Sequence, residues 1–150
     1  SRTTPSMTAY NASSSIGSNA GRVAIDAPKQ ALVRADPRHL QSAISNVVRN
    51  SLSYATPGTP VTLRVESHGG RARVAVRDRG PGIPAEERKT LFSPFSRGRN
   101  GLKRPGAGLG LFIARRVLEA HGGTISLRPS RSGSIFVLEL PAEGSQLAAS

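Results

Sequence analysis

Two glycine-rich segments and one pair of asparagines contain the residue types that suit a phosphate-bearing ligand. Residues 106–110 read Gly-Ala-Gly-Leu-Gly and lead into a predicted helix. A helix N-terminus presents free N–H groups and the positive end of the helix dipole, so this junction is a ready site for phosphate. It is not a P-loop, because no Gly-Lys-Ser/Thr follows. It is not a dinucleotide fingerprint either, because a basic loop precedes it rather than a strand.

The second glycine-rich segment follows a predicted strand and begins with an aspartate. Asp78, Gly80 and Gly82 form the pattern Asp-x-Gly-x-Gly. Glycines let the backbone turn sharply and let a ligand approach closely, and the aspartate can accept a hydrogen bond from an amino group such as that of adenine. Taken alone, a plain turn after a strand is the simpler interpretation.

The third feature is a polar row on a predicted helix. Asn46, Asn50 and Tyr54 are four residues apart, so they lie on one side of that helix. Asparagine side chains compete with the helix backbone for hydrogen bonds, so two of them in register suggest a polar task. An amide oxygen can ligate Mg²⁺ while the ion keeps waters and phosphate oxygens. The alternative is that both asparagines are only solvated.

The elements that position these residues follow from the apolar pattern. Asp36 and Pro37 form a helix-start signal, and apolar residues at helical spacing predict a helix over residues 37–54. A second helix begins near Gly110 and ends at Gly122. Strands are expected at residues 23–28, 31–35, 61–66, 73–77, 125–127 and 135–140.

Antiparallel strands with helices gathered on one face make an α+β fold, a two-layer α/β sandwich. We expect residues 21–142 to form this single domain. Few apolar residues occur in the flanking segments 1–20 and 143–150, so these are expected to be flexible tails.

The composition narrows the classes of function. The 150 residues include no cysteine and three separated histidines, which excludes thiolate chemistry and argues against a zinc site. No apolar run has the length of a membrane span, so we expect a cytoplasmic fragment without membrane contact. The net charge of +12 suits phosphate-bearing partners, although a solvated basic surface would give the same value.

The same charge raises an alternative from another class, a basic nucleic-acid-binding module. The chain has four Phe and two Tyr, and none is interleaved with Arg and Gly on a strand as in proteins that bind single strands. We therefore expect no nucleic-acid partner.

Together the segments resemble the catalytic ATP-binding domain of bacterial sensor histidine kinases, in the GHKL ATP-binding superfamily. Residues 46–50 resemble the N box of that family and residues 78–83 its G1 box. Residues 91–97 resemble the F box and residues 106–111 the G2 box, while His121, Gly122 and Gly123 match the end of its second helix. The resemblance covers about residues 22–141 and implies a GHKL-type fold with a mixed, mostly antiparallel sheet.

The resemblance also implies roles for individual residues. Asn50 would hold Mg²⁺ with Asn46 near the phosphates, and Asp78 would bind the adenine amino group while Gly82 lets the ring approach. The other implied members of the nucleotide site are Tyr54 and Ile83 lining the adenine pocket, Gly80 of the G1 box, Ser134 near adenine, and Gly106, Gly108, Leu109 and Gly110 with their N–H groups on the phosphates.

By the same resemblance, residues 92–105 would form a lid over ATP. From it Arg97, Lys103 or Arg104 would reach the γ-phosphate, and Arg97 and Arg104 join Asn46 as the residues expected to act in catalysis. The alternative is that these cations only keep a loop soluble. One position departs from the family, which commonly has a basic residue where this chain has Ser53. We expect Lys103 or Arg104 to compensate.

The implied reaction is transfer of the γ-phosphoryl group rather than hydrolysis. Related ATPases have a glutamate at the position of Asn46, and a neutral amide cannot accept a proton from water. In sensor kinases the acceptor is a histidine followed by Glu or Asp on a separate dimerisation domain, and neither His39, His68 nor His121 has that context.

We therefore expect a monomeric fragment that binds Mg·ATP without phosphorylating itself. Its partners would be the histidine-bearing dimerisation domain of the parent and, through the parent, a response regulator. The sequence leaves two alternatives open for the parent, a cytoplasmic protein or one anchored in the bacterial cell membrane. A serine-kinase anti-sigma factor of the same superfamily is the related alternative, and the form of the F box favours a sensor kinase over it. A degenerate scaffold is a third, against which Asn50 and Asp78 argue.

Overall fold

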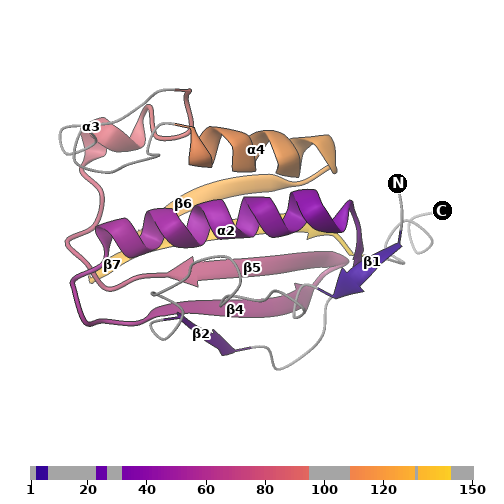
Figure 1. Cartoon of the computed structure of the whole chain (residues 1–150), viewed down its shortest axis with the longest axis horizontal. Helices are drawn as coiled ribbons and strands as arrows, with labels where there is room; N and C mark the ends of the chain where they lie inside the picture. Colours follow the sequence, from indigo (N-terminus) through magenta and orange to yellow (C-terminus); the bar gives the residue numbers. More distant parts are fainter. Residues whose placement is uncertain (1–2, 7–22, 27–31, 95–108, 131, 143–150) are drawn as a thin grey trace.

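The computed structural model describes residues 3–6, 23–26, 32–94, 109–130 and 132–142 (Figure 1). Most of both expected tails and the basic loop before the second helix lie outside these ranges. Within the first expected tail, Thr3–Ser6 forms strand β1, which pairs antiparallel with β3 (Leu32–Arg34) in a small separate sheet.

One layer of the domain is a five-stranded sheet with the strand order β2-β4-β5-β7-β6. Its strands are β2 (Val23–Asp26), β4 (Val61–His68), β5 (Arg71–Arg77), β6 (Thr124–Ser130) and β7 (Gly133–Pro141). β2 runs parallel to β4, and the other neighbouring strands pair antiparallel. The predicted mixed, mostly antiparallel sheet is confirmed.

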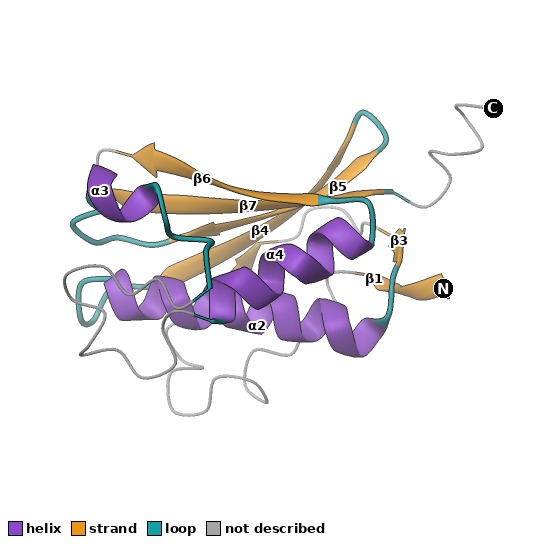
Figure 2. Cartoon of the chain, turned by 90° about the horizontal axis from the view of Figure 1, so that it is seen from above, coloured by secondary structure: helices purple, strands orange, loops and turns teal. Residues whose placement is uncertain are grey.

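The other layer consists of α2 (Pro37–Tyr54) and α4 (Gly110–Ala120), which pack side by side on one face of the sheet (Figure 2). A short helix, α3 (Ala85–Arg88), lies beyond the end of β5. The predicted two-layer sandwich with helices on one face is confirmed. None of the helices in the described part of the chain is long and apolar enough to cross a membrane.

Helix α2 begins where the sequence predicts. The Asp36 side chain accepts hydrogen bonds from the backbone N–H groups of Arg38, at 2.9 Å, and His39, at 3.3 Å. These bonds hold the pKa of the Asp36 carboxyl below its usual range. The apolar side of α2, including Val47 and Val48, is buried against the sheet, which leaves its polar row at the edge of the core.

The core lies between the two layers. Leu63 and Val65 of β4 and Val74 and Val76 of β5 point inward with at most 2% of their surface exposed, as the period-two pattern predicts. Phe136 of β7 lies opposite Val76 and is fully buried. Each such side chain contributes roughly 1.5–3 kcal/mol of burial, so the core fixes the strand register that positions the site.

Helix α4 ends at a histidine that ties the two helices together. The Nε2 atom of His121 accepts a hydrogen bond from the N–H of Asp36, at 3.2 Å, so its Nδ1 carries the proton that is donated to the Val117 carbonyl, at 2.8 Å. Gly122 follows with a φ of 77°, which suits glycine. The predicted helix end is confirmed, and the His121 ring joins the start of α2 to the end of α4.

Candidate nucleotide-binding site

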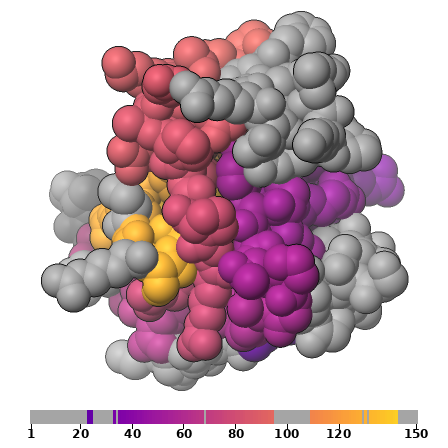
Figure 3. Space-filling model, turned by 90° about the vertical axis from the view of Figure 1, so that its left-hand side faces the viewer, coloured from indigo at the N-terminus to yellow at the C-terminus, as the bar shows by residue number. Residues whose placement is uncertain are grey.

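The candidate site lies at the end of the sheet where β5 stops. Seen end-on, the loop that leaves β5 runs between the α2–β4 connection (magenta) and the start of β7 (yellow; Figure 3). Asp78 begins this loop and Ser134 lies on β7 beside it. The Ser134 hydroxyl donates to Oδ2 of Asp78 at 2.7 Å, and the N–H of Asp78 donates to the Ser134 carbonyl at 3.0 Å. The structure thus brings together two predicted site residues that are 56 positions apart.

Asp78 is a buried carboxyl with one oxygen left open. Only 1% of its surface is exposed, and burial raises its pKa, an effect that the hydrogen bonds from Ser134 partly offset. Oδ1 has no hydrogen-bond partner within the described residues. A buried acceptor without a partner is costly to keep, so this atom is suited to receive a donor from a ligand.

Gly133 belongs to this site although the sequence analysis did not select it. Its φ is 141°, and a Cβ there would clash with the carbonyl oxygen of Asp78 and come within 3.0 Å of Oδ1. Any side chain at Gly133 would therefore displace the carboxyl. The sequence contains only a weak signal, a glycine at the turn before the last strand.

Gly80 and Gly82 are required for different reasons, one for close packing and one for a turn. A Cβ on Gly80 would clash with the backbone of Tyr54, and the neighbouring Arg79 carbonyl accepts a hydrogen bond from the N–H of Thr56 at 2.8 Å. Gly80 therefore lets the loop rest on the C-terminal end of α2. Gly82 has a φ of 82° and makes the turn itself.

Two predicted members of the adenine pocket lie in the core next to this loop. Tyr54 is the last residue of α2, and Ile83 follows the glycine turn. Both are buried within the hydrophobic core cluster. The loop that joins Asp78 to Ile83 rests on the end of α2, where Gly80 lies against the backbone of Tyr54.

Asn46, the first residue of the polar row of α2, lies against the start of α4. A Cβ on Gly110 would lie 3.7 Å from Cβ of Asn46 and 3.8 Å from its Oδ1, so the Asn46 amide lies against the first residue of α4. Leu109, at the N-cap position, provides no side-chain cap for the first turn of α4. The structure thus places the first turn of α4, with its free N–H groups, beside Asn46 of the predicted pair.

The two asparagines differ in what their amide oxygens contact. Oδ1 of Asn46 accepts a hydrogen bond from Nη1 of Arg49 at 3.3 Å. Oδ1 of Asn50 is buried and has no partner within the described residues. The hydroxyl of Ser53 turns back to its own helix and donates to the Asn50 carbonyl at 2.7 Å. Asn50 is therefore the better suited of the two for a metal ion.

Acidic ligands do not gather here. In the ranges that the structure describes, no three His, Asp or Glu side chains form a potential metal cluster. A divalent ion at this site would need its remaining ligands from phosphate oxygens and water, which is the coordination that Mg²⁺ prefers.

Other predicted residues lie outside the described part of the chain. These are Arg97, Lys103, Arg104, Gly106 and Gly108. Of the F box, residues 91–94 are described, and the ring of Phe92 meets that of Phe136 edge-on, with centroids 6.2 Å apart.

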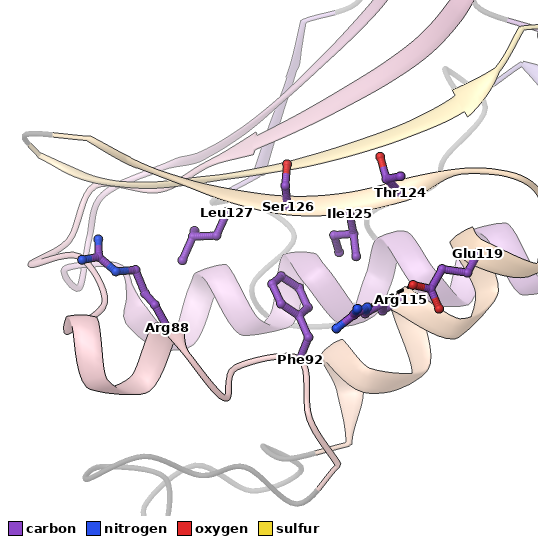
Figure 4. Close-up of a pocket in the computed structure, with 8 residues that line it drawn as sticks. All are labelled: Arg88, Phe92, Arg115, Glu119, Thr124, Ile125, Ser126 and Leu127. Carbon is purple, nitrogen blue, oxygen red and sulfur yellow. Dashed lines mark hydrogen bonds and ion pairs between the residues drawn. The ribbon is translucent and has the colours of Figure 1, made fainter.

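Figure 4 shows Phe92 pointing toward Ile125 and Leu127 of β6, in a recess of about 420 Å³. The recess lies between α4 and β6, and Arg115 and Glu119 at its rim are paired at 3.1 Å. None of the predicted nucleotide-binding residues lines it. Phe92 was predicted to begin the lid, and the structure shows that its ring is anchored in the domain.

Comparison with known proteins shows the family of this chain. A 124-residue segment is 38% identical to the sensor-like histidine kinase SenX3 of Mycobacterium tuberculosis, covering 80% of this chain and 30% of SenX3. A 121-residue segment is 35% identical to the probable sensor histidine kinase TcrY of the same species, covering 79% of this chain and 26% of TcrY. The chain thus spans less than a third of the length of these relatives.

Solved structures give the same result for the fold. The mycobacterial sensor histidine kinase MprB matches with a TM-score of 0.70 and 30% identity, covering 81% of this chain and 83% of that one. The catalytic domain of the histidine kinase ThkA matches with a TM-score of 0.69 and 29% identity, covering 79% and 77% of the two chains. The model of the histidine kinase-, DNA gyrase B- and HSP90-like ATPases matches residues 35–144. The chain therefore belongs to this family of ATPases and has the fold of a histidine kinase catalytic domain.

Proposed function

We propose that this chain binds Mg·ATP and transfers the γ-phosphoryl group to a histidine on a separate dimerisation domain, as the catalytic half of a two-component sensor kinase. Family membership implies nucleotide use. The observation that supports the proposal further is the buried pair of Asp78 and Ser134 at the end of β5, which leaves Oδ1 of Asp78 open. On α2, Oδ1 of Asn50 is open as well, and Asn46 lies against the start of α4.

Adenine would be recognised by Asp78. Its Oδ2 is engaged by Ser134, which leaves Oδ1 to accept a hydrogen bond from the exocyclic amine. Gly133 lets the Asp78 backbone and carboxyl keep this position, Gly82 would let the ring approach, and Tyr54 and Ile83 would provide apolar contact. Only a donor satisfies Oδ1, so this pocket would favour adenine over guanine, which has a carbonyl oxygen at the corresponding position.

The triphosphate would lie between α2 and the start of α4. The N–H groups of Leu109 and Gly110 and those of Gly106 and Gly108 would bind phosphate oxygens. The donor set fits Mg²⁺, since the buried Oδ1 of Asn50 is a neutral oxygen ligand without a partner in the described residues. When bound, the ion would neutralise charge on the phosphates.

The role of Asn46 favours transfer over hydrolysis. Its amide oxygen is occupied by Arg49, and the amide has no basic atom that would remove a proton from water. The chain would therefore hold ATP until an acceptor arrives, and Arg97, Lys103 or Arg104 would stabilise the γ-phosphoryl group during transfer.

The acceptor would come from outside this chain. His121 has both ring nitrogens engaged, by Val117 and by Asp36, and His39 and His68 lack the acceptor sequence. The partners would be the dimerisation domain of the parent kinase and, through it, a response regulator. No nucleic acid or membrane surface is needed for this activity.

A phosphotransfer assay tests the proposal. The chain is incubated with γ-labelled ATP and Mg²⁺, with and without a helical, histidine-bearing dimerisation domain from a sensor kinase. We expect acid-labile label on the added domain and none on the chain itself. Acid-stable label on a serine would favour a serine kinase instead, and rapid release of free phosphate without an acceptor would favour an ATPase.

A further inference from the structure

A cation is held over the polar row of α2. Arg49 lies on the exposed side of that helix, and its side chain reaches back almost one turn. There Nη1 donates to Oδ1 of Asn46 at 3.3 Å. An exposed arginine that is drawn back onto a site residue is different from a solvated one, because its charge has a defined position.

The contact also fixes which way the Asn46 amide points. A guanidinium group has only donors, so the amide oxygen must face Arg49. The amide nitrogen, with its two N–H donors, is then turned to the other side. Oδ1 of Asn46, rather than the amide nitrogen, is also the polar atom of that side chain that lies nearest to Gly110, so the guanidinium that binds it is held close to the first turn of α4.

Charge at this point matters for a polyphosphate. The N-terminus of a helix contributes only about half an elementary charge. Ser53, one turn further along α2, contributes none, since its hydroxyl is bound to the Asn50 carbonyl. Among the residues of α2 that border the site, Arg49 is thus the one whose cationic group contacts a predicted phosphate-binding residue.

We propose that Arg49 is a phosphate-recognition residue of this chain. Its guanidinium, held on Oδ1 of Asn46 close to the first turn of α4, supplies the positive charge that position 53 lacks. This inference rests on the proposed function, because it takes the ligand to be a nucleotide with a polyphosphate group.

The test compares Arg49→Gln and Arg49→Lys with the intact chain. Calorimetric titrations use three ligands with Mg²⁺: adenosine, ADP and a non-hydrolysable ATP analogue. Arg38→Gln is the matched control, since Arg38 is another exposed arginine of the same helix, in its first turn. A second arm adds Ser53→Lys to Arg49→Gln, which returns a cation to the next turn of the same side.

If the charge of Arg49 binds phosphate, removing it should cost more affinity the more phosphates the ligand has. Arg49→Gln should lower the affinity for the ATP analogue about five- to tenfold. It should lower the affinity for ADP less, and it should leave the affinity for adenosine unchanged. Arg49→Lys should retain most of the affinity, Ser53→Lys should restore part of it, and added salt should reduce the difference between variant and wild type. Arg38→Gln should leave all three affinities unchanged.

The other outcomes separate the two proposals. Equal weakening of adenosine and the ATP analogue by Arg49→Gln would mean that Arg49 only supports the fold and would overturn the inference. Unchanged affinity for the analogue would overturn it too, while leaving the nucleotide site itself intact. A wild-type chain that binds none of the three ligands would remove the proposed function and this inference with it.

Discussion

Asp78 and Ser134 are joined by two hydrogen bonds, one between their side chains at 2.7 Å and one between their backbones at 3.0 Å. The pairing fixes the carboxyl at the end of β5 and satisfies one of its two oxygens. The other oxygen remains open beside Gly133. The fold thus gives the candidate site a carboxyl of fixed position with one oxygen available to a ligand.

Removal of the Ser134 hydroxyl should weaken both the fold and the site. Ser134→Ala leaves Oδ2 of Asp78 buried without a donor, which costs about 1–3 kcal/mol of unfolding free energy. It should also weaken binding of an ATP analogue, because the carboxyl loses its fixed orientation. Denaturant unfolding and calorimetry measure the two effects. Ser126→Ala on the exposed edge strand β6 is the control, and an equal effect there would contradict the assignment.

The raised pKa of Asp78 predicts a dependence of stability on pH. The folded chain holds the proton of Asp78 more strongly than the unfolded chain, because burial disfavours the charged carboxyl. The contribution of Asp78 is therefore most favourable below the unfolded pKa, and it is lost as the pH rises through the folded pKa.

Asp78→Asn removes this titration. We expect the variant to have a higher thermal midpoint than the wild type at neutral pH, with a difference that shrinks as the pH falls below the ordinary pKa of an aspartate. Thermal unfolding from pH 3 to pH 8 measures it. A difference that stays constant over this range would show that Asp78 carries no such penalty.

Gly133 should tolerate no side chain. Gly133→Ala combines an unfavourable φ with a clash against the Asp78 backbone, so we expect a loss of about 2–4 kcal/mol and of nucleotide binding. Gly69→Ala is the matched control, since Gly69 also has a positive φ of 58° but has open space around its Cβ position. That change should cost only about 1 kcal/mol and leave binding intact. Similar losses of stability from both changes would show that the positive φ, and not the clash with Asp78, causes the loss at Gly133.

Asn50 should determine how much Mg²⁺ increases the affinity for an ATP analogue. Asn50→Ala removes an amide oxygen that has no partner in the described residues, so stability should hardly change. Affinity for an ATP analogue should fall about tenfold with Mg²⁺ present and stay the same with the metal removed by a chelator. Asn46→Ala is the comparison and should weaken binding under both conditions. A loss of equal size with and without Mg²⁺ in Asn50→Ala would exclude it as the ligand.

The sequence predicts the main elements because their signals are local. Asp36 followed by Pro37 marks the start of α2, and alternation on β4 and β5 marks a hairpin with one buried face. The pattern from Asp78 to Gly82 could be recognised for the same reason, since a glycine turn after a strand involves only neighbouring residues.

Features that depend on distant contacts could not be predicted in this way. The need for glycine at position 133 arises from the Asp78 backbone, which is far away in sequence. The strand β1 lies in a segment that was expected to be a flexible tail, so its pairing with β3 was not predicted. Arg49 and Asn46 are close in sequence, so their contact could be expected, but only packing brings Gly110 beside Asn46.

The most direct test of the central claim is calorimetric titration of the chain with a non-hydrolysable ATP analogue in Mg²⁺, alongside Asp78→Ala. We predict that the wild type binds one equivalent and that Asp78→Ala, while still folded by circular dichroism, loses most of that affinity. A folded wild type that binds no nucleotide, or an Asp78→Ala variant that binds as tightly as the wild type, would contradict the proposed site.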